Sequence, residues 1–371
     1  MNHPLIPPAD PLGIPSPVWI FQVLAIVTLL LHFLFMNYVF GGMLIVAVNE
    51  WFLGRKKEAM KGNGILVRVM PVCLSMAITM GVAPLLFVQV LYGQFFYTAN
   101  IMHGWWWLAI LAALTIVFYA FYVMMARRTD AEESNAVVKL LSLLTVILLI
   151  FVMFILTNNA VMTDRPDYWK AVFSGERNFI VPDGSFVPRF LHNFIGAIAV
   201  AGLWIAIIGR YQLRFHPDNA DAANYLIRSG LHWSAIGVVG GMVTGFWFLF
   251  SLGGETLKTF MGNGILFVGW AIGALTSIGI LICLILALVK PEHPKYLWGA
   301  TGFSVITLLG MVMGKELLRI IALDPYFSVQ QLSVRPNYSS LVLFLGTFVL
   351  GLAVLGWLIR LVWNLPKHDE A

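Results

Sequence analysis

The sequence predicts an all-α membrane protein: a polytopic bundle of nine transmembrane helices forming a single domain over residues 1–371. The first observation is composition, because 60% of the residues are hydrophobic and only 11% are charged. Soluble domains are about 45–50% apolar and roughly 25% charged. The second observation is that continuously apolar runs, long enough to cross a bilayer, recur from end to end. Such runs indicate membrane helices and exclude an alternating transmembrane β-barrel.

Each span is predicted where an apolar run is bounded by polar residues or by Gly and Pro. The first run follows a Pro-rich leader and is too long for a signal peptide. The longest polar stretch, 162–189, is expected to be an external loop. In chain order the expected spans are 18–50, 67–96, 104–126, 137–160, 190–213, 228–252, 263–289, 296–320 and 338–363.

The orientation follows from the distribution of Lys and Arg, which cytoplasmic loops collect in excess. Basic residues concentrate after the first, third, fifth and seventh spans, as in Arg55–Lys57 and Arg127–Arg128. The N-terminus is therefore expected outside and the C-terminus in the cytoplasm. The net charge of +5 lies mostly in these short loops, so it sets topology and gives no support to nucleic-acid binding.

Several chemistries are excluded by missing motifs. The two cysteines, Cys73 and Cys283, lie inside apolar runs, and the sequence has no CxxC or CxxCH. It therefore carries no zinc knuckle, iron–sulfur site or covalently attached c-type haem. HExxH, GxSxG, Walker and GxGxxG motifs are also missing, which leaves hydrolase, ATPase and dinucleotide functions without support.

Ionisable residues inside spans are functional candidates, because an unpartnered one costs several kcal/mol in a membrane. His32 lies near the middle of the first span. A neutral imidazole there either bonds a neighbouring carbonyl or Asn37, or ligates haem iron through one ring nitrogen. His103 is expected to open the third span and His192 the fifth, both near the outer face, whereas His232 is expected near the cytoplasmic face.

Two carboxylates complete the candidate set. Glu316 and Arg319 are three residues apart near the outer end of the eighth span, so they share a helix face, either as a helix-end ion pair or as part of a site. Glu255 follows Gly253–Gly254 at the outer end of the sixth span. The candidates thus collect in the outer half of the bundle, which indicates a cofactor site there. They are His32, His103, His192, Glu255, Glu316 and Arg319.

These segments resemble subunit I of cytochrome bd oxidase. Leu31–Phe35 resembles the segment that supplies a haem ligand in the first span, and Gly81–Ala83 resembles a stretch of the second. Arg189–His192 resembles the segment whose His ligates the low-spin haem b. Gly253–Glu255 and Glu316–Arg319 resemble the segments after the sixth span and at the end of the eighth, where Glu ligates a high-spin haem. The resemblance implies His32, His192 and Glu316 as metal ligands, with His103 as a further candidate.

The sequence also departs from that family. The third span has no carboxylate, whereas the family has two near its oxygen site, and His103 stands close to the first of those positions. Phe267 occupies the nearest match to the family's Met ligand, so His103, Met311 and Met313 are candidates for a sixth ligand at His192. The loop that usually binds quinol is reduced to 253–262, so we expect any quinol to enter between helices near Gln89 or Asn37.

The sequence therefore predicts an integral membrane subunit of a bacterial respiratory complex in the inner membrane. It would hold one or more haem b groups, with two expected, and pass electrons between quinone and a periplasmic redox partner such as a c-type cytochrome. The lipid bilayer and another membrane subunit are its other expected partners. The alternatives are a divergent bd-type quinol:oxygen oxidoreductase, and a non-redox anchor or transporter that kept the fold.

Overall fold

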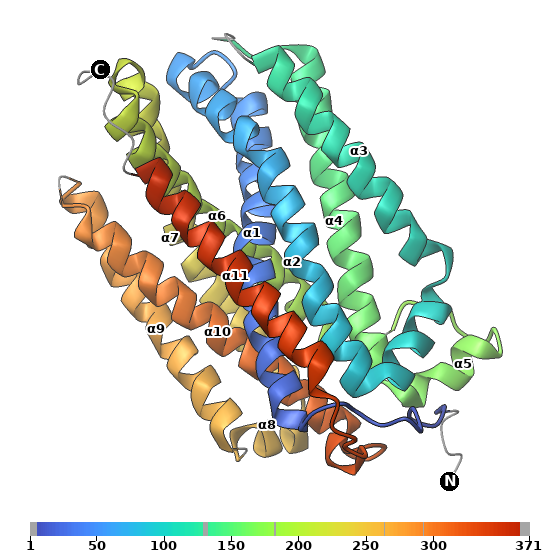
Figure 1. The fold of residues 1–371 in the computed structure, drawn as a ribbon. Helices are drawn as coiled ribbons and strands as arrows, with labels where there is room; N and C mark the ends of the chain where they lie inside the picture. The colour runs from blue at the N-terminus through green and yellow to red at the C-terminus, as the bar shows by residue number, and fades with distance from the viewer. Residues whose placement is uncertain (1–5, 129–132, 182, 263, 292, 364–371) are drawn as a thin grey trace.

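The computed structural model describes residues 6–128, 133–181, 183–262, 264–291 and 293–363. Long helices that run roughly side by side make up most of these residues (Figure 1). The first four are α1 (Val18–Phe52), α2 (Lys57–His103), α3 (Trp105–Arg128) and α4 (Ala136–Asp164). They are followed by α6 (Phe186–Phe215), α7 (Ala220–Phe250), α9 (Gly264–Val289), α10 (Lys295–Leu323) and α11 (Tyr338–Trp363).

The predicted membrane helix bundle is confirmed, but the count of nine spans is not. Within the described residues, 8 helices are long and apolar enough to cross a membrane, and α10 is not among them. This helix runs through the bundle beside α9 (Figure 1), and its last third carries Lys315, Glu316 and Arg319. The orientation of the bundle in the membrane stays a prediction.

The second helix is much longer than the predicted span 67–96. It covers 47 residues, with one non-helical residue, Tyr92, at a kink. His103 ends this helix instead of opening the next one, and Gly104 adopts the left-handed region at φ 51°. The polar stretch before Gly104 stays helical because its side chains bond within the protein, as in Asn159 donating to Asn100 over 2.8 Å.

Short elements close one end of the bundle, which we call the α8 end. The predicted loop 162–189 contains a 3₁₀ turn (η1, Pro166–Tyr168) and a short helix α5 (Trp169–Phe173), and the predicted loop 253–262 contains α8 (Gly254–Met261). At the same end Ile14 pairs with Val334 in an isolated bridge, with the Ile14 amide donating to Ser333 over 2.8 Å. These contacts fasten the N-terminal segment to the connection between α10 and α11.

Glycines bring α6 and α7 into backbone contact. A Cβ on Gly202 would lie 2.4 Å from the Ser234 amide nitrogen, and one on Gly237 would lie 2.4 Å from that of Ala199. Since real Cβ atoms do not approach backbone so closely, any larger residue would force these helices apart. We call this contact the α6–α7 seam.

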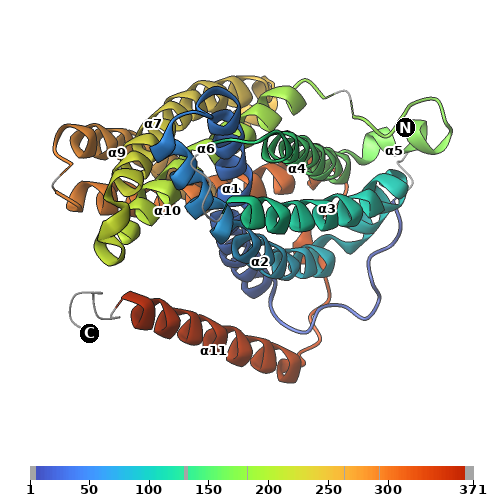
Figure 2. The same ribbon diagram turned by 90° about the horizontal axis from the view of Figure 1, so that it is seen from above.

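The last helix is packed differently from the rest. None of its described side chains is fully buried, and in Figure 2 it lies at the side of the bundle. Phe344 links it to α2, because its ring packs edge-on against Phe87 with centroids 5.3 Å apart.

Candidate functional site

His32 and His192 are held in the same way, each by the helix opposite its own. The Nδ1 atom of His32 lies 2.7 Å from the carbonyl oxygen of Ala77 in α2. The Nδ1 atom of His192 lies 3.0 Å from the carbonyl oxygen of Gly241 in α7. A carbonyl only accepts, so each Nδ1 carries the proton and each Nε2 keeps its lone pair. Among the described residues, neither Nε2 has a hydrogen-bond partner.

A glycine one turn beyond each acceptor makes room for the ring. Gly81 follows Ala77 by four residues, and a Cβ on it would lie 2.8 Å from Nδ1 of His32. Gly245 follows Gly241 by four residues, and a Cβ on it would lie 3.0 Å from Cε1 of His192. We call each combination of acceptor carbonyl and glycine a histidine seat.

His103 is bonded differently, because both of its ring nitrogens are used within the protein. Its Nδ1 donates to Ala99 of its own helix over 2.8 Å, and its Nε2 accepts from the Asn158 amide over 2.8 Å. Asn158 also accepts from the Val181 amide over 3.1 Å. The buried His103 therefore fastens the segment before α6 to α2 and α4, and an iron ligand there would displace Asn158.

Glu316 and Arg319 form the ion pair expected from their spacing, and the structure adds partners that the sequence did not indicate. Arg319 donates to Oε2 of Glu316 over 2.9 Å, and Tyr92 donates to Oε1 over 2.8 Å. Asp164, the last residue of α4, lies 3.7 Å from Nε of Arg319 and 3.8 Å from Nη1 of Arg189. We call these five residues the Asp164 cluster.

The Asp164 cluster is incompletely bonded. Oδ1 of Asp164 and Nε of both arginines are buried and have no hydrogen-bond partner among the described residues. Separations of 3.7 and 3.8 Å are too long for direct hydrogen bonds and fit bridging by water. The cluster thus has free donors and a free acceptor.

A pocket of about 600 Å³ opens beside this cluster at the α8 end. It is polar, with carboxylates, guanidinium groups and hydroxyls in its wall. It lies between the end of α4, the start of α6, the turn after α7 and the end of α10. Its polar lining residues include Asp164, Arg165, Asp183, Arg189 and Ser251.

At the rim of the pocket, Asp183 is held ionised. Arg165 donates to its Oδ2 over 2.7 Å, and the Ser185 amide donates to its Oδ1 over 2.7 Å. Burial alone raises the pKa of the Asp183 carboxyl, but the hydrogen bonds from Ser185 and the charge of Arg165 outweigh burial. The pKa of Asp183 therefore lies below its ordinary value.

The remaining candidates lie apart from this arrangement. Glu255 is exposed in the first turn of α8. Met313 packs on Gly269 of α9, where a Cβ would lie 2.2 Å from its methyl carbon. Asn37 is buried, with 6% of its surface exposed, so it offers no lateral entry for a quinol. The side-chain oxygen of Gln89 accepts from the Tyr97 hydroxyl over 3.1 Å.

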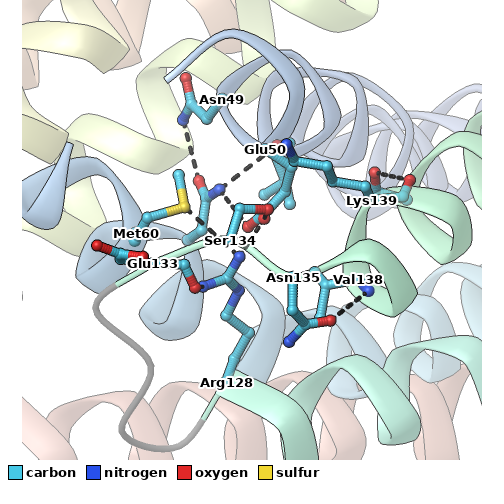
Figure 3. Close-up of polar contacts among 12 residues, drawn as sticks. Asn49, Glu50, Met60, Arg128, Glu133, Ser134, Asn135, Val138 and Lys139 are labelled. Atoms are coloured by element: carbon cyan, nitrogen blue, oxygen red, sulfur yellow. Dashed lines mark hydrogen bonds and ion pairs between the residues drawn. The ribbon is translucent and has the colours of Figure 1, made fainter. Parts of the chain in front are cut away.

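A second buried charge cluster, at the opposite end of the bundle, was not expected from the sequence (Figure 3). Glu50 of α1 pairs with Arg128 of α3, and their side chains are 0% and 1% exposed. Asn63 donates to Oε1 of Glu50 over 2.8 Å, and the Ser134 hydroxyl donates to Oε2. Asn49 donates to Asn63 over 2.9 Å, which extends the Glu50 cluster along α1.

The histidine seats fit the requirements of a haem ligand. A ligating His donates its other ring N–H to a carbonyl or carboxylate, which fixes the tautomer and leaves the second nitrogen for the metal. His32 and His192 meet this condition. The described residues contain no group of three or more His, Cys, Asp or Glu that could hold a metal ion. A haem iron is already held by its macrocycle, so a single imidazole from the protein could bind it.

The fold defines an all-helical, multi-pass membrane protein. The fold is similar to that of the bd oxidase of Geobacillus thermodenitrificans, with a TM-score of 0.66. The alignment covers 95% of this chain and 100% of that chain, with 15% sequence identity. At this identity the similarity concerns the fold. No family model matches the sequence, and no curated protein matches it.

Proposed function

We propose that the chain is a haem b-binding membrane subunit of a respiratory complex, which passes electrons between quinone and a redox partner outside the membrane. The two histidine seats carry this proposal. In each of them, a neutral imidazole is oriented by a carbonyl of the neighbouring helix and keeps its Nε2 for a ligand. The bd oxidase fold and the sequence resemblance support it.

Within this proposal the residues have distinct roles. His32 and His192 would hold the haem iron, and a bound haem b would supply one-electron redox chemistry. The His192 ring packs beside Gly245 of α7. Gly245 lies six residues before Ser251 of the pocket wall, a distance of about 9 Å along a helix. Glu316 remains a candidate ligand, because each of its bonded oxygens retains a lone pair. His103 is proposed to position the segment before α6.

The pocket at the α8 end is proposed as the site of the quinol head group. Quinol oxidation releases two electrons and two protons, so it needs a proton acceptor beside the ring. Asp164 meets this need, because it lines the pocket and its Oδ1 has no hydrogen-bond partner among the described residues. Arg189 and Ser251 supply donors for the quinone oxygens. By the positive-inside prediction this end faces outside, where released protons and a docked partner would meet.

Reduced-minus-oxidised visible spectra and haem content per chain test the proposal. We expect a haem b spectrum from the purified chain, loss of haem in His32→Ala and in His192→Ala, and little change in His232→Ala. His232 is the matched control, since its Nδ1 bonds the carbonyl oxygen of Arg228 in its own helix, over 2.7 Å. A chain without haem supports the non-redox anchor or transporter instead.

A divergent quinol:oxygen oxidoreductase is the second candidate, favoured by the fold alone. Oxygen reduction needs protons at a buried site, and α3 supplies no carboxylate for them. We therefore expect no oxygen uptake by the purified chain with a reduced quinol. Robust uptake without a partner protein would establish the oxidase.

A further inference from the structure

Among the described residues, Lys315 has an aromatic ring, that of Phe33, beside its positive charge and no acidic partner. Its side chain is exposed on α10, between the buried Gly314 and Glu316. It lies eight residues before the end of this helix at Leu323, about 12 Å along the axis. Among the described residues its ammonium makes no hydrogen bond or ion pair. A charge at this depth of a membrane protein normally faces a partner or water.

The charges around Lys315 do not balance. Among the described residues whose charges act on Lys315, Arg189 and Arg319 are basic, and Asp164 and Glu316 are acidic. Arg319 already occupies Oε2 of Glu316, and both arginines flank Asp164. One cation is therefore left over, and Lys315 is the one whose side chain is exposed.

Lys315 contacts the residue next to His32. Its ammonium lies over the ring of Phe33 at 5.8 Å from the centroid, and the His32 and Phe33 rings are 5.8 Å apart. The Lys315 ammonium therefore lies no farther than twice 5.8 Å from the His32 imidazole. One porphyrin with its side chains spans such a distance, so a group bound at His32 can reach Lys315.

We propose that Lys315 binds a carboxylate of the group held at His32, which for haem b is a propionate. This inference rests on the proposed function. The propionates are the only anionic groups of haem b, so a cation on one side of the ligand fixes how the ring is turned about the iron–histidine bond. Lys315 is a positioning residue that acts on the haem periphery, and α10 thereby contributes to a site whose ligand comes from α1.

The test compares the binding of haem with that of haem dimethyl ester, in which both carboxylates are blocked, to the full chain purified from haem-starved cells. We expect the unchanged chain to prefer haem, and Lys315→Met to lose about tenfold of this preference, as for one charge-assisted hydrogen bond. Lys315→Arg should retain it. The matched control is Lys295→Met, at the other end of the same helix, where the ammonium also lies over a ring, that of Tyr296 at 5.2 Å.

Phospholipid phosphorus per chain distinguishes the second source of an anion. If Lys315→Met loses bound phospholipid and keeps the preference for haem, a lipid headgroup is the partner and the inference is wrong. Equal binding of haem and its dimethyl ester by the unchanged chain also overturns it. A chain that binds neither compound contradicts the proposed function itself, which separates the two failures.

Discussion

The Glu50 cluster and the Asp164 cluster lie toward opposite ends of the bundle, and in both of them buried carboxylates lie beside arginines. In the Glu50 cluster, Arg128, Asn63 and Ser134 hydrogen-bond both carboxylate oxygens. In the Asp164 cluster, Oδ1 of Asp164 has no bond, and the guanidinium groups stay 3.7 and 3.8 Å away. A buried carboxylate that is fully bonded ties helices together, whereas an incompletely bonded one beside a pocket is available to a ligand or a proton.

The largest expected effect is on the Glu50 cluster. Glu50→Gln removes one charge and leaves Arg128 buried without a counter-charge, which should lower the free energy of unfolding by about 3–5 kcal/mol. Unfolding in mixed detergent, followed by circular dichroism, measures this loss. The double variant Glu50→Met with Arg128→Met should recover much of it. A single-variant loss no larger than that of Asp164→Asn would break the distinction between the clusters.

Substitutions in the histidine seats are expected to have the next largest effect. Gly81→Ala and Gly245→Ala place a methyl group at 2.8 and 3.0 Å from the ring atoms of His32 and His192. Displacing each ring should cost about 1–3 kcal/mol in stability and lower haem content, as measured by absorbance per chain. Gly196→Ala is the control, because a Cβ there meets nothing within 4 Å. Unchanged spectra in both seat variants would show that the seats do not set the histidine positions.

The Asp164 cluster should respond in function more than in stability. Asp164→Asn keeps the shape of the side chain and removes the proton acceptor, so quinol-driven reduction of the chain should slow by about 100-fold, at the lower end of the range for general base catalysis. Stopped-flow absorbance measures this rate. Reduction by dithionite, which needs no proton acceptor, is the internal control and should be unchanged. Equal slowing with both reductants would assign Asp164 a structural role like that of Glu50.

The smallest effect concerns the pocket rim. Because the folded-state pKa of Asp183 is lowered, its contribution to stability is complete above the ordinary value of about 3.9 and is lost as the pH falls through the folded-state pKa. Arg165 is 39% exposed, so we expect less than about 1 kcal/mol. Hydrogen exchange in residues 165–181 at about pH 6 and about pH 3 measures it. Asp183→Asn should remove this response, and persistence of the full response would assign it to another group.

Composition and hydropathy predicted the membrane bundle because a charge-poor chain has few other ways to bury its surface. The same patterns misplaced the boundary at His103, since polar residues normally indicate a loop. There they stay helical because Asn158 and Asn159 of α4 bond them, and this pairing depends on a contact between distant segments.

The candidate site residues also divide into those that the sequence pattern indicates and those that depend on contacts between distant segments. His32, His192 and Glu316 were predictable because each is a polar residue in an apolar run. Asp164 and Glu50 lie at the ends of such runs, where a carboxylate is ordinary in sequence. Only their burial against Arg319 and Arg128 distinguishes them. The role of Gly81 and Gly245 is visible only in the structure, where each of them lies against a histidine ring of another helix.

The α6–α7 seam has a mechanical consequence. His192 belongs to α6 and its acceptor Gly241 to α7, so the length of that hydrogen bond is set by the spacing of the two helices. At Gly202 and Gly237 this spacing is fixed by backbone against backbone, and no flexible side chain lies between to yield. The His192 imidazole is therefore held by two helices whose spacing is rigid. A group attached to its Nε2 inherits that stiffness, and gaining or losing one electron there should displace the surrounding atoms very little.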